Sequence, residues 1–378
     1  MSAAFLPFAR PVIDEAMVAA VADTLRSRWI ASGPQVAAFE AALSAYAGGR
    51  PVRSFTSATG AMSVALELLG VGPGDEVVTP AQSFFASANV IERAGARAVF
   101  VDVELATRNI DLAQAAAAVT PRTKALLPVH YNAPLDPAAL AAFRARHGVR
   151  VLEDAALAIG SVAGGRPVGA TGDLVSFSFH PNKNMTTIEG GALVLNDAAE
   201  AARAERLRFH GIARLPDGTR DLEMAGGKYN LSDVSARLGL AQLARLGEWC
   251  AARERLAMAY FEGLAGDELL GPERLPPREN PGHSWNMFTV LLPLAEMALT
   301  RQAFIEAMRR EGIGVGISYE AIHLTTCYRA RGWREGQFPV SERIGRETVS
   351  LPLFPEMTPA DVERVCAALR RLVRSRGA

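Results

Sequence analysis

Short apolar segments alternate with helical segments through the first half of the chain, and this alternation constrains the fold more than any other feature. The apolar segments are residues 76–79, 98–102, 125–129 and 149–152. The helical segments lie near residues 84–94, 111–118 and 136–147. Strands that alternate with helices in this way predict βαβ units and a mostly parallel sheet. We therefore expect an α/β fold, with helices on both sides of the sheet.

The length of 378 residues exceeds the usual size of one domain, so we expect two. The expected large domain comprises residues 1–245, and a smaller C-terminal α+β domain comprises residues 246–378. A long, alanine-rich helix over residues 232–263 is expected to join them. The C-terminal part carries an apolar strand (288–292), a helix near 300–311 and a final helix that opens at Thr358.

Helices are also expected near the N-terminus. Residues 12–46 are helical in character and are interrupted at Gly33, and a helix over residues 61–69 closes at Gly70.

The charge balance excludes some classes of function. Lysine plus arginine equals aspartate plus glutamate at 40 each, and no basic tract predicts binding to nucleic acid or to an anionic membrane. No apolar run reaches about 18 residues, so we expect neither a signal peptide nor a membrane span, and hence a cytoplasmic protein. Cys250, Cys327 and Cys366 are too scattered for a disulfide framework, and no spacing predicts a metal site.

Lys183 and Asp154 are the candidate catalytic residues. Lys183 ends the run Phe177-Ser178-Phe179-His180-Pro181-Asn182-Lys183, and Asp154 directly follows the apolar segment 149–152. A lysine amine can condense with the aldehyde of pyridoxal phosphate (PLP), and a carboxylate can keep the pyridine nitrogen of that cofactor protonated. Burial and a nearby cation would lower the pKa of the lysine, so that its amine could act as a nucleophile and a proton shuttle.

Three further features complete this candidate site. The run Ser57-Ala58-Thr59 precedes a helix, where free N–H groups favour a phosphate. Ser178 could add a hydroxyl to that phosphate, and Phe84 could stack on the pyridine ring. Each feature has an ordinary alternative: a helix cap, a core phenylalanine or a surface lysine. Their order, beyond the carboxyl ends of parallel strands, favours a joint site.

With these residues identified, the chain resembles the DegT/StrS-type sugar aminotransferases, which have the fold type I (aspartate aminotransferase) architecture, over nearly its whole length. The matching segments are residues 29–34, 74–77, 100–103, 128–131 and 153–156. Within the family it is most similar to enzymes that aminate a UDP-4-keto-pentose to form 4-amino-4-deoxy-L-arabinose. The segments that carry this closer likeness are residues 57–59, 177–180, 183–186, 209–211, 228–231 and 351–355.

The resemblance implies roles for individual residues. Lys183 binds the cofactor covalently and Asp154 pairs with the pyridine nitrogen. Phe84 stacks on the ring, and the phosphate is held by Ala58, Thr59 and Ser178.

The resemblance also implies a homodimer with shared active sites. Asn230 would reach the phosphate in the partner subunit's site, and Lys228 and Tyr229 of the same loop would contact the substrate. Lys228 could equally be a solvated loop lysine. His323 could line the sugar pocket, whereas His180 fits a structural histidine better.

One position departs from the family pattern. The residue after Glu153-Asp154-Ala155-Ala156 is usually glutamine or histidine, and here it is Leu157. Leucine donates no hydrogen bond, so cofactor tuning and sugar specificity at this position are open. The retained lysine argues against the deoxygenating relatives, in which histidine replaces it.

The resulting expectation is a PLP-dependent aminotransferase that moves an amino group from L-glutamate to a nucleotide-linked 4-keto-sugar. Pyridoxamine phosphate is the aminated form of the cofactor between the two half-reactions. The resemblance also implies a role in polysaccharide or lipopolysaccharide biosynthesis. Amination of a 3-keto-sugar or a keto-cyclitol is an alternative, and a PLP-binding regulatory protein without turnover is another.

Overall fold

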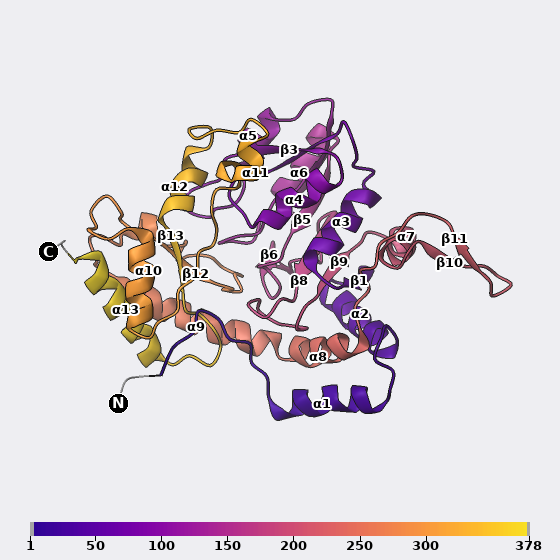
Figure 1. The fold of residues 1–378 in the computed structure, drawn as a ribbon, viewed down its shortest axis with the longest axis horizontal. Helices are drawn as coiled ribbons and strands as arrows, with labels where there is room; N and C mark the ends of the chain where they lie inside the picture. Colours follow the sequence, from indigo (N-terminus) through magenta and orange to yellow (C-terminus); the bar gives the residue numbers. More distant parts are fainter. Residues whose placement is uncertain (1–3, 376–378) are drawn as a thin grey trace.

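A seven-stranded sheet forms the centre of the structure, a computed structural model that describes residues 4–375 (Figure 1). In spatial order its strands are β1 (Val52–Phe55), β9 (Gly191–Val194), β8 (Leu174–Ser178), β5 (Arg150–Asp154), β4 (Thr123–Leu126), β2 (Glu76–Pro80) and β3 (Arg97–Val101). β9 runs antiparallel to β1 and β8, and the other adjacent pairs are parallel. The expected α/β fold with a mostly parallel sheet is confirmed.

Helices cover both faces of this sheet. One face is covered by α3 (Ala58–Leu68), α4 (Phe85–Arg93) and α7 (Ala198–Arg208). The other is covered by α2 (Pro34–Tyr46), α8 (Asp233–Ala244), α5 (Leu112–Ala117) and α6 (Pro137–His147). Consecutive strand residues point to opposite faces, so Leu152 packs with α3 while Val151 packs with α6. Strands buried on both faces explain the continuous apolar segments of the sequence.

The expected helix over residues 232–263 is wrong in one respect, because the structure divides it into α8 and α9 (Leu246–Leu264). The break is at Arg245, whose φ of −109° and ψ of 4° lie outside the helical region. Arg245 pairs there with Asp14 and lies over the ring of Trp249. The break lets α8 pack against the large sheet while Tyr260 of α9 packs in the C-terminal core.

The C-terminal part has a core of its own around an antiparallel strand pair, β12 (Phe288–Leu291) and β13 (Thr348–Leu351). The helices of this part are α10 (Arg301–Arg310), α11 (Thr326–Arg329), α12 (Pro339–Glu347) and α13 (Pro359–Val373), with single 3-10 turns η1 (Pro272–Arg274) and η2 (Ile322–Leu324). The final helix begins with the expected capping box between Thr358 and Asp361.

The N-terminal segment also contacts this C-terminal core. Leu6 pairs with Ile313 in a parallel bridge, and its side chain is buried with Phe304 and Trp285. The chain then leads into α1 (Glu15–Arg26), which lies along α8 (Figure 1).

Two short hairpins complete the described elements. They are formed by β6 (Val162–Ala163) with β7 (Arg166–Pro167), and by β10 (Ile212–Arg214) with β11 (Arg220–Leu222). The second hairpin projects away from the sheet, at the right of Figure 1. Among residues 4–375, no helix is long and apolar enough to cross a membrane.

Candidate active site

Two neighbouring parallel strands end at the candidate site. Asp154 is the last residue of β5 and Ser178 is the last residue of β8, and Asp154 lies opposite Ser176 in their register. Parallel strands have their carboxyl ends at the same edge of a sheet, where ligands of open α/β sheets bind. Both side chains therefore lie at the edge at which the sequence predicted the site.

A cavity of about 290 Å³ lies at this edge. The predicted residues that line it are Ala58, Thr59, Phe84, Asp154, Ser178 and Lys183. They come from the start of α3, the turn before α4, the end of β5, and the end of β8 with the turn that follows it. The volume is close to the lower end of the range of about 300 to 1,000 Å³ that small-ligand sites occupy.

Lys183 brings its amine into this cavity from the turn that follows β8. Its backbone N–H donates to the carbonyl of His180 at 2.9 Å. Burial lowers the pKa of Lys183 from 10.5 to about 8, while the negative charge of Asp154 acts in the opposite direction. At pH 7 about a tenth of the amine is neutral, compared with about 0.03% for an unshifted lysine. The site therefore supplies a nucleophilic amine near neutral pH.

Asp154 is held in a fixed orientation by one hydrogen-bond donor on each oxygen. The hydroxyl of Ser87 donates to Oδ2 at 2.8 Å, and the N–H of Ala156 donates to Oδ1 at 3.1 Å. Only 4% of the residue is exposed. Both oxygens are thus fixed, and the carboxylate is oriented at the cavity that it lines.

The N-terminus of α3 provides donors for an anion. Ser57 caps the helix by accepting the N–H of Gly60 at 3.0 Å, and the N–H groups of Ala58 and Thr59 have no partner within the helix. Gly191 of β9 passes directly behind this end, because a Cβ at Gly191 would lie 2.3 Å from the nitrogen of Ala58. With the helix dipole and the Ser178 hydroxyl, this end of the cavity has the donors that a phosphate would need.

Aromatic and aliphatic side chains line the rest of the cavity. Phe84 is 53% exposed, and its ring centroid lies 5.6 Å from that of Tyr319. Leu157 is buried, packs with Tyr131 and Met287, and also lines the cavity. The position that departs from the family pattern is thus part of an apolar wall.

The predicted residues Lys228, Tyr229 and Asn230 do not line this cavity. Lys228 is exposed, bonds Asn230 through its amine and lies over the ring of Phe209 at 4.8 Å. The ring of Tyr229 packs against α3, since a Cβ at Gly60 would lie 3.2 Å from it. Within one chain, Lys228 and Asn230 are separate from the cavity.

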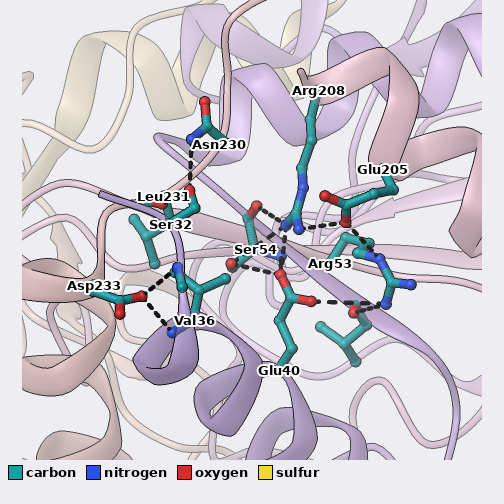
Figure 2. Close-up of polar contacts among 12 residues, drawn as sticks. Ser32, Val36, Glu40, Arg53, Ser54, Glu205, Arg208, Asn230, Leu231 and Asp233 are labelled. Carbon is teal, nitrogen blue, oxygen red and sulfur yellow. Dashed lines mark hydrogen bonds and ion pairs between the residues drawn. The ribbon is translucent and has the colours of Figure 1, made fainter. Parts of the chain in front are cut away.

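Ser32 bonds Asn230, and Asp233 fixes the backbone that follows Ser32 (Figure 2). Asn230 donates to the hydroxyl of Ser32 at 2.5 Å, and that hydroxyl donates to the carbonyl of Leu231. Asp233 is fully buried, and its carboxylate accepts N–H groups of Gly33, Gln35 and Val36 at 2.8 to 3.1 Å. This carboxylate ties the start of α8 to the start of α2.

The two histidines singled out from the sequence have different surroundings from those expected. His323 is fully buried, bonds Glu342 at 3.0 Å and packs edge-on against Phe338, away from the cavity lining. Burial lowers the pKa of His323. His180 lines the cavity, and half of its side chain is exposed.

Sequence reasoning missed two residues of this region. Ser57 was part of the predicted run 57–59, and the structure shows it as the cap of α3. Ser87 lies inside a helix and carries no such signal, although it contacts Asp154. Tyr319 comes from the C-terminal part of the chain, and its place beside Phe84 depends on how the two parts pack.

The donor set around the cavity fits PLP. A buried carboxylate can face a pyridinium, an amine with a lowered pKa can bind an aldehyde, and a helix N-terminus with a serine hydroxyl can hold a phosphate. The exposed ring of Phe84 in the same cavity lining offers a surface on which an aromatic ring can stack.

Comparison with known proteins agrees with this chemistry. The model of the DegT/DnrJ/EryC1/StrS aminotransferase family matches residues 11–370. The aminotransferase TlmJ from Streptoalloteichus hindustanus is 34% identical, with a TM-score of 0.89, and 97% of this chain and 98% of that chain are covered. The match extends across both parts of the molecule.

Two further solved structures are similar over their whole length. Spr1654 from Streptococcus pneumoniae, named as a sugar aminotransferase and solved in its PMP form, is 28% identical, with a TM-score of 0.89 and coverage of 97% of this chain and 99% of that chain. DesI, solved in the presence of its TDP-sugar product, is 30% identical, with a TM-score of 0.86 and coverage of 99% of this chain and 94% of that chain.

Proposed function

This chain belongs to the DegT/DnrJ/EryC1/StrS aminotransferase family, which uses PLP, and on this premise we propose its two substrates. The amino donor is L-glutamate, and the acceptor is a nucleotide-linked keto-sugar that is aminated at the 4-position. The observation that carries the proposal is the single cavity onto which the Lys183 amine, the Asp154 carboxylate and the start of α3 open.

The cofactor is held by residues from four segments in this proposal. The N–H groups of Ala58 and Thr59 and the hydroxyl of Ser178 bind its phosphate, and Phe84 stacks on its ring. When bound, PLP supplies an aldehyde that takes up the amino group and a pyridinium that withdraws electrons from the adjacent carbon. Asp154 supports the charge of that pyridinium by pairing with it.

Lys183 has two tasks in the proposed reaction. Its neutral amine is the covalent anchor of the cofactor, and it is also the base that removes a proton from the carbon that bears the amino group. As the ammonium, Nζ returns the proton at the end of each half-reaction. A pKa of about 8 suits both tasks, because the neutral and the charged forms are both accessible near pH 7.

The choice of a nucleotide-linked sugar rests on the relatives and on the wall of the cavity. DesI was solved with a TDP-sugar product, and the segments 57–59 and 177–180 resemble enzymes that aminate the 4-position. Leu157 adds an apolar surface where relatives carry a hydrogen-bonding side chain, so we infer that the part of the substrate next to Leu157 carries no hydroxyl group.

We also propose that the enzyme is a homodimer. Lys228 and Asn230 lie outside the cavity of their own chain, and the exposed apolar side chains Trp29, Ile30 and Phe209 belong to the same region. Burial of these side chains against a second copy would be favourable. It would also bring Asn230 to the phosphate in the partner subunit's cavity and Lys228 to the negative groups of the substrate.

Spectroscopy of the two half-reactions tests the proposed substrates. L-glutamate added to the holoenzyme should remove the visible band of the lysine-bound cofactor and release 2-oxoglutarate. A nucleotide 4-keto-sugar should then restore the band, whereas a 3-keto-sugar and a keto-cyclitol should leave it absent. No spectral change with L-glutamate would overturn the donor, and restoration by the 3-keto-sugar alone would overturn the acceptor. Sedimentation equilibrium gives the subunit number, and a monomer at the assay concentration would end the proposal of shared sites.

A further inference from the structure

Ser87 makes the one side-chain hydrogen bond that the structure gives Asp154 within residues 4–375. Its Oγ lies 2.8 Å from Oδ2 of Asp154, and the two residues are 67 positions apart in the sequence. Ser87 is fully buried. Ser87 lies in the first turn of α4, and its hydroxyl bonds to a carboxylate on another element.

The direction of this hydrogen bond follows from the chemistry of its partners. A charged carboxylate only accepts, so Ser87 must donate its proton to Asp154. The Oγ of Ser83 lies 3.1 Å from that of Ser87, and Ser83 must therefore be the donor in this pair. The result is a short relay in which each hydroxyl strengthens the next bond toward the carboxylate.

The position of Ser87 in α4 links it to the ring-binding end of the cavity. Phe84 is the residue before the helix, and the backbone N–H of Ser87 donates to its carbonyl at 3.2 Å. The same helical turn therefore fixes the side chain beside the ring and the hydroxyl that orients the carboxylate. Bulk water cannot replace that hydroxyl, because both Ser87 and Asp154 are buried.

We propose that Ser87 is a positioning residue that holds the Asp154 carboxylate toward the ring nitrogen of the cofactor and keeps that carboxylate charged. The inference rests on the proposed role of Asp154 as the partner of the pyridine nitrogen. A donor on Oδ2 makes the carboxylate a weaker competitor for the proton that it shares with the ring, so the proton stays on nitrogen. Without Ser87 the ring is less often protonated and withdraws electrons less strongly.

The chain offers a matched control in Ser341 and Asp102. Ser341 also lies in the first turn of a helix, is fully buried and donates its hydroxyl to a buried aspartate at 2.6 Å. That pair does not line the cavity. Ser87→Ala and Ser341→Ala therefore remove the same chemical group from equivalent surroundings, and only the first touches the proposed site.

The test compares both variants with the wild-type holoenzyme. Ser87→Ala should lower kcat by about tenfold to a hundredfold with little change in KM, in keeping with a hydrogen bond to a charged group. The nitrogen NMR signal of 15N-labelled PLP should move toward the unprotonated ring, and the pH profile of the visible band should shift. Ser341→Ala should leave kcat, the nitrogen signal and the pH profile unchanged, although both serine variants should lower Tm by similar amounts. Ser87→Cys, which keeps the size and a weak donor, should lie in between.

Failure of this inference can be distinguished from failure of the proposed function. A wild-type enzyme that transaminates, with a Ser87→Ala variant whose nitrogen signal and kcat match those of Ser341→Ala, would overturn the role of Ser87 alone. A wild-type enzyme that never takes up PLP would overturn the proposed role of Asp154 first. In the background of Asp154→Asn, Ser87→Ala should have no further effect on the nitrogen signal, and an undiminished effect there would also contradict the inference.

Discussion

Lys183 and Lys228 are the same residue type in opposite environments, and the regions around them differ accordingly. Lys183 opens onto the cavity with Asp154 and the start of α3, and burial brings its pKa to about 8. Lys228 lies on the surface, bonds Asn230 and stacks over Phe209. The first region brings together the groups that the proposed cofactor chemistry requires of one chain. The second lies apart from that cavity, in keeping with the proposed role of Lys228 and Asn230 in a second copy.

The lysine comparison gives the largest expected effect. The lysines of the chain are Lys124, Lys183 and Lys228. Lys183→Ala should lower kcat by about ten-thousandfold or more, because it removes both the covalent anchor and the proton shuttle. Lys124→Ala, a change at an exposed position of β4, should leave kcat unchanged. Steady-state assays measure both, and turnover retained in Lys183→Ala would contradict the account.

Asp233 tests whether the region around Lys228 and Asn230 is rigid in its own right. Asp233→Ala leaves three N–H groups at the start of α2 without their acceptor, so the free energy of unfolding should fall by about 2 to 3 kcal/mol. Asp197 is the control, because it caps α7 with a single bond at an exposed site, and Asp197→Ala should cost about 1 kcal/mol. Urea denaturation distinguishes them, and equal losses would show that the buried carboxylate adds nothing beyond an ordinary cap.

Asn230 tests whether the region around Lys228 and Asn230 contributes to the cavity of the partner subunit. Asn230→Ala should raise the Kd for PLP about tenfold if its amide reaches the partner's phosphate. A mixture of Lys183→Ala and Asn230→Ala subunits should regain activity with wild-type PLP affinity, because one site of each hybrid dimer has both residues. Activity no greater than the sum of the two variants alone would exclude the shared site.

The pH dependence of cofactor uptake gives the smallest expected effect. Covalent uptake of PLP by the apoenzyme needs the neutral amine, so its rate should rise about fivefold from pH 7 to pH 8 and level off above pH 8. Asp154→Asn removes the charge that raises the pKa of Lys183, so the midpoint should move to lower pH. Stopped-flow absorbance measures the uptake rate and the midpoint of its pH dependence. An uptake rate that still climbs tenfold per pH unit at pH 9 would contradict a lowered pKa of Lys183.

The same pKa shift affects the stability of the apoenzyme. Between pH 8 and 10.5 the folded chain binds fewer protons at Lys183 than the unfolded chain, so the free energy of unfolding rises with pH across this window.

The sequence could place several residues together at the cavity because local order determines their positions. Asp154 and Ser178 end strands, and Ala58 begins a helix, so the pattern of strands and helices already brings them to one edge. The same reasoning could not find Tyr319 or Ser87. Tyr319 depends on how the C-terminal part packs, and Ser87 depends on the rotation of a helix about its axis.

The division of the predicted long helix at Arg245 has a comparable cause. Apolar residues continue through the break at a helical spacing, so the sequence gives no sign of it. α8 packs in the core of the large sheet and α9 continues into the C-terminal core, and Asp14 pairs with the arginine at the junction. Likewise, His323 was assigned to the sugar pocket by resemblance, and only the structure shows it buried against Glu342.

Reduction of the holoenzyme with borohydride, followed by peptide mass mapping, tests the central claim most directly. Borohydride makes the bond between the cofactor and its lysine permanent, and the candidate sites are Lys124, Lys183 and Lys228. The pyridoxyl group should be found on the peptide that contains Lys183, at close to one per chain. A label on Lys124 or Lys228, or a reduced protein that carries no label, would contradict it.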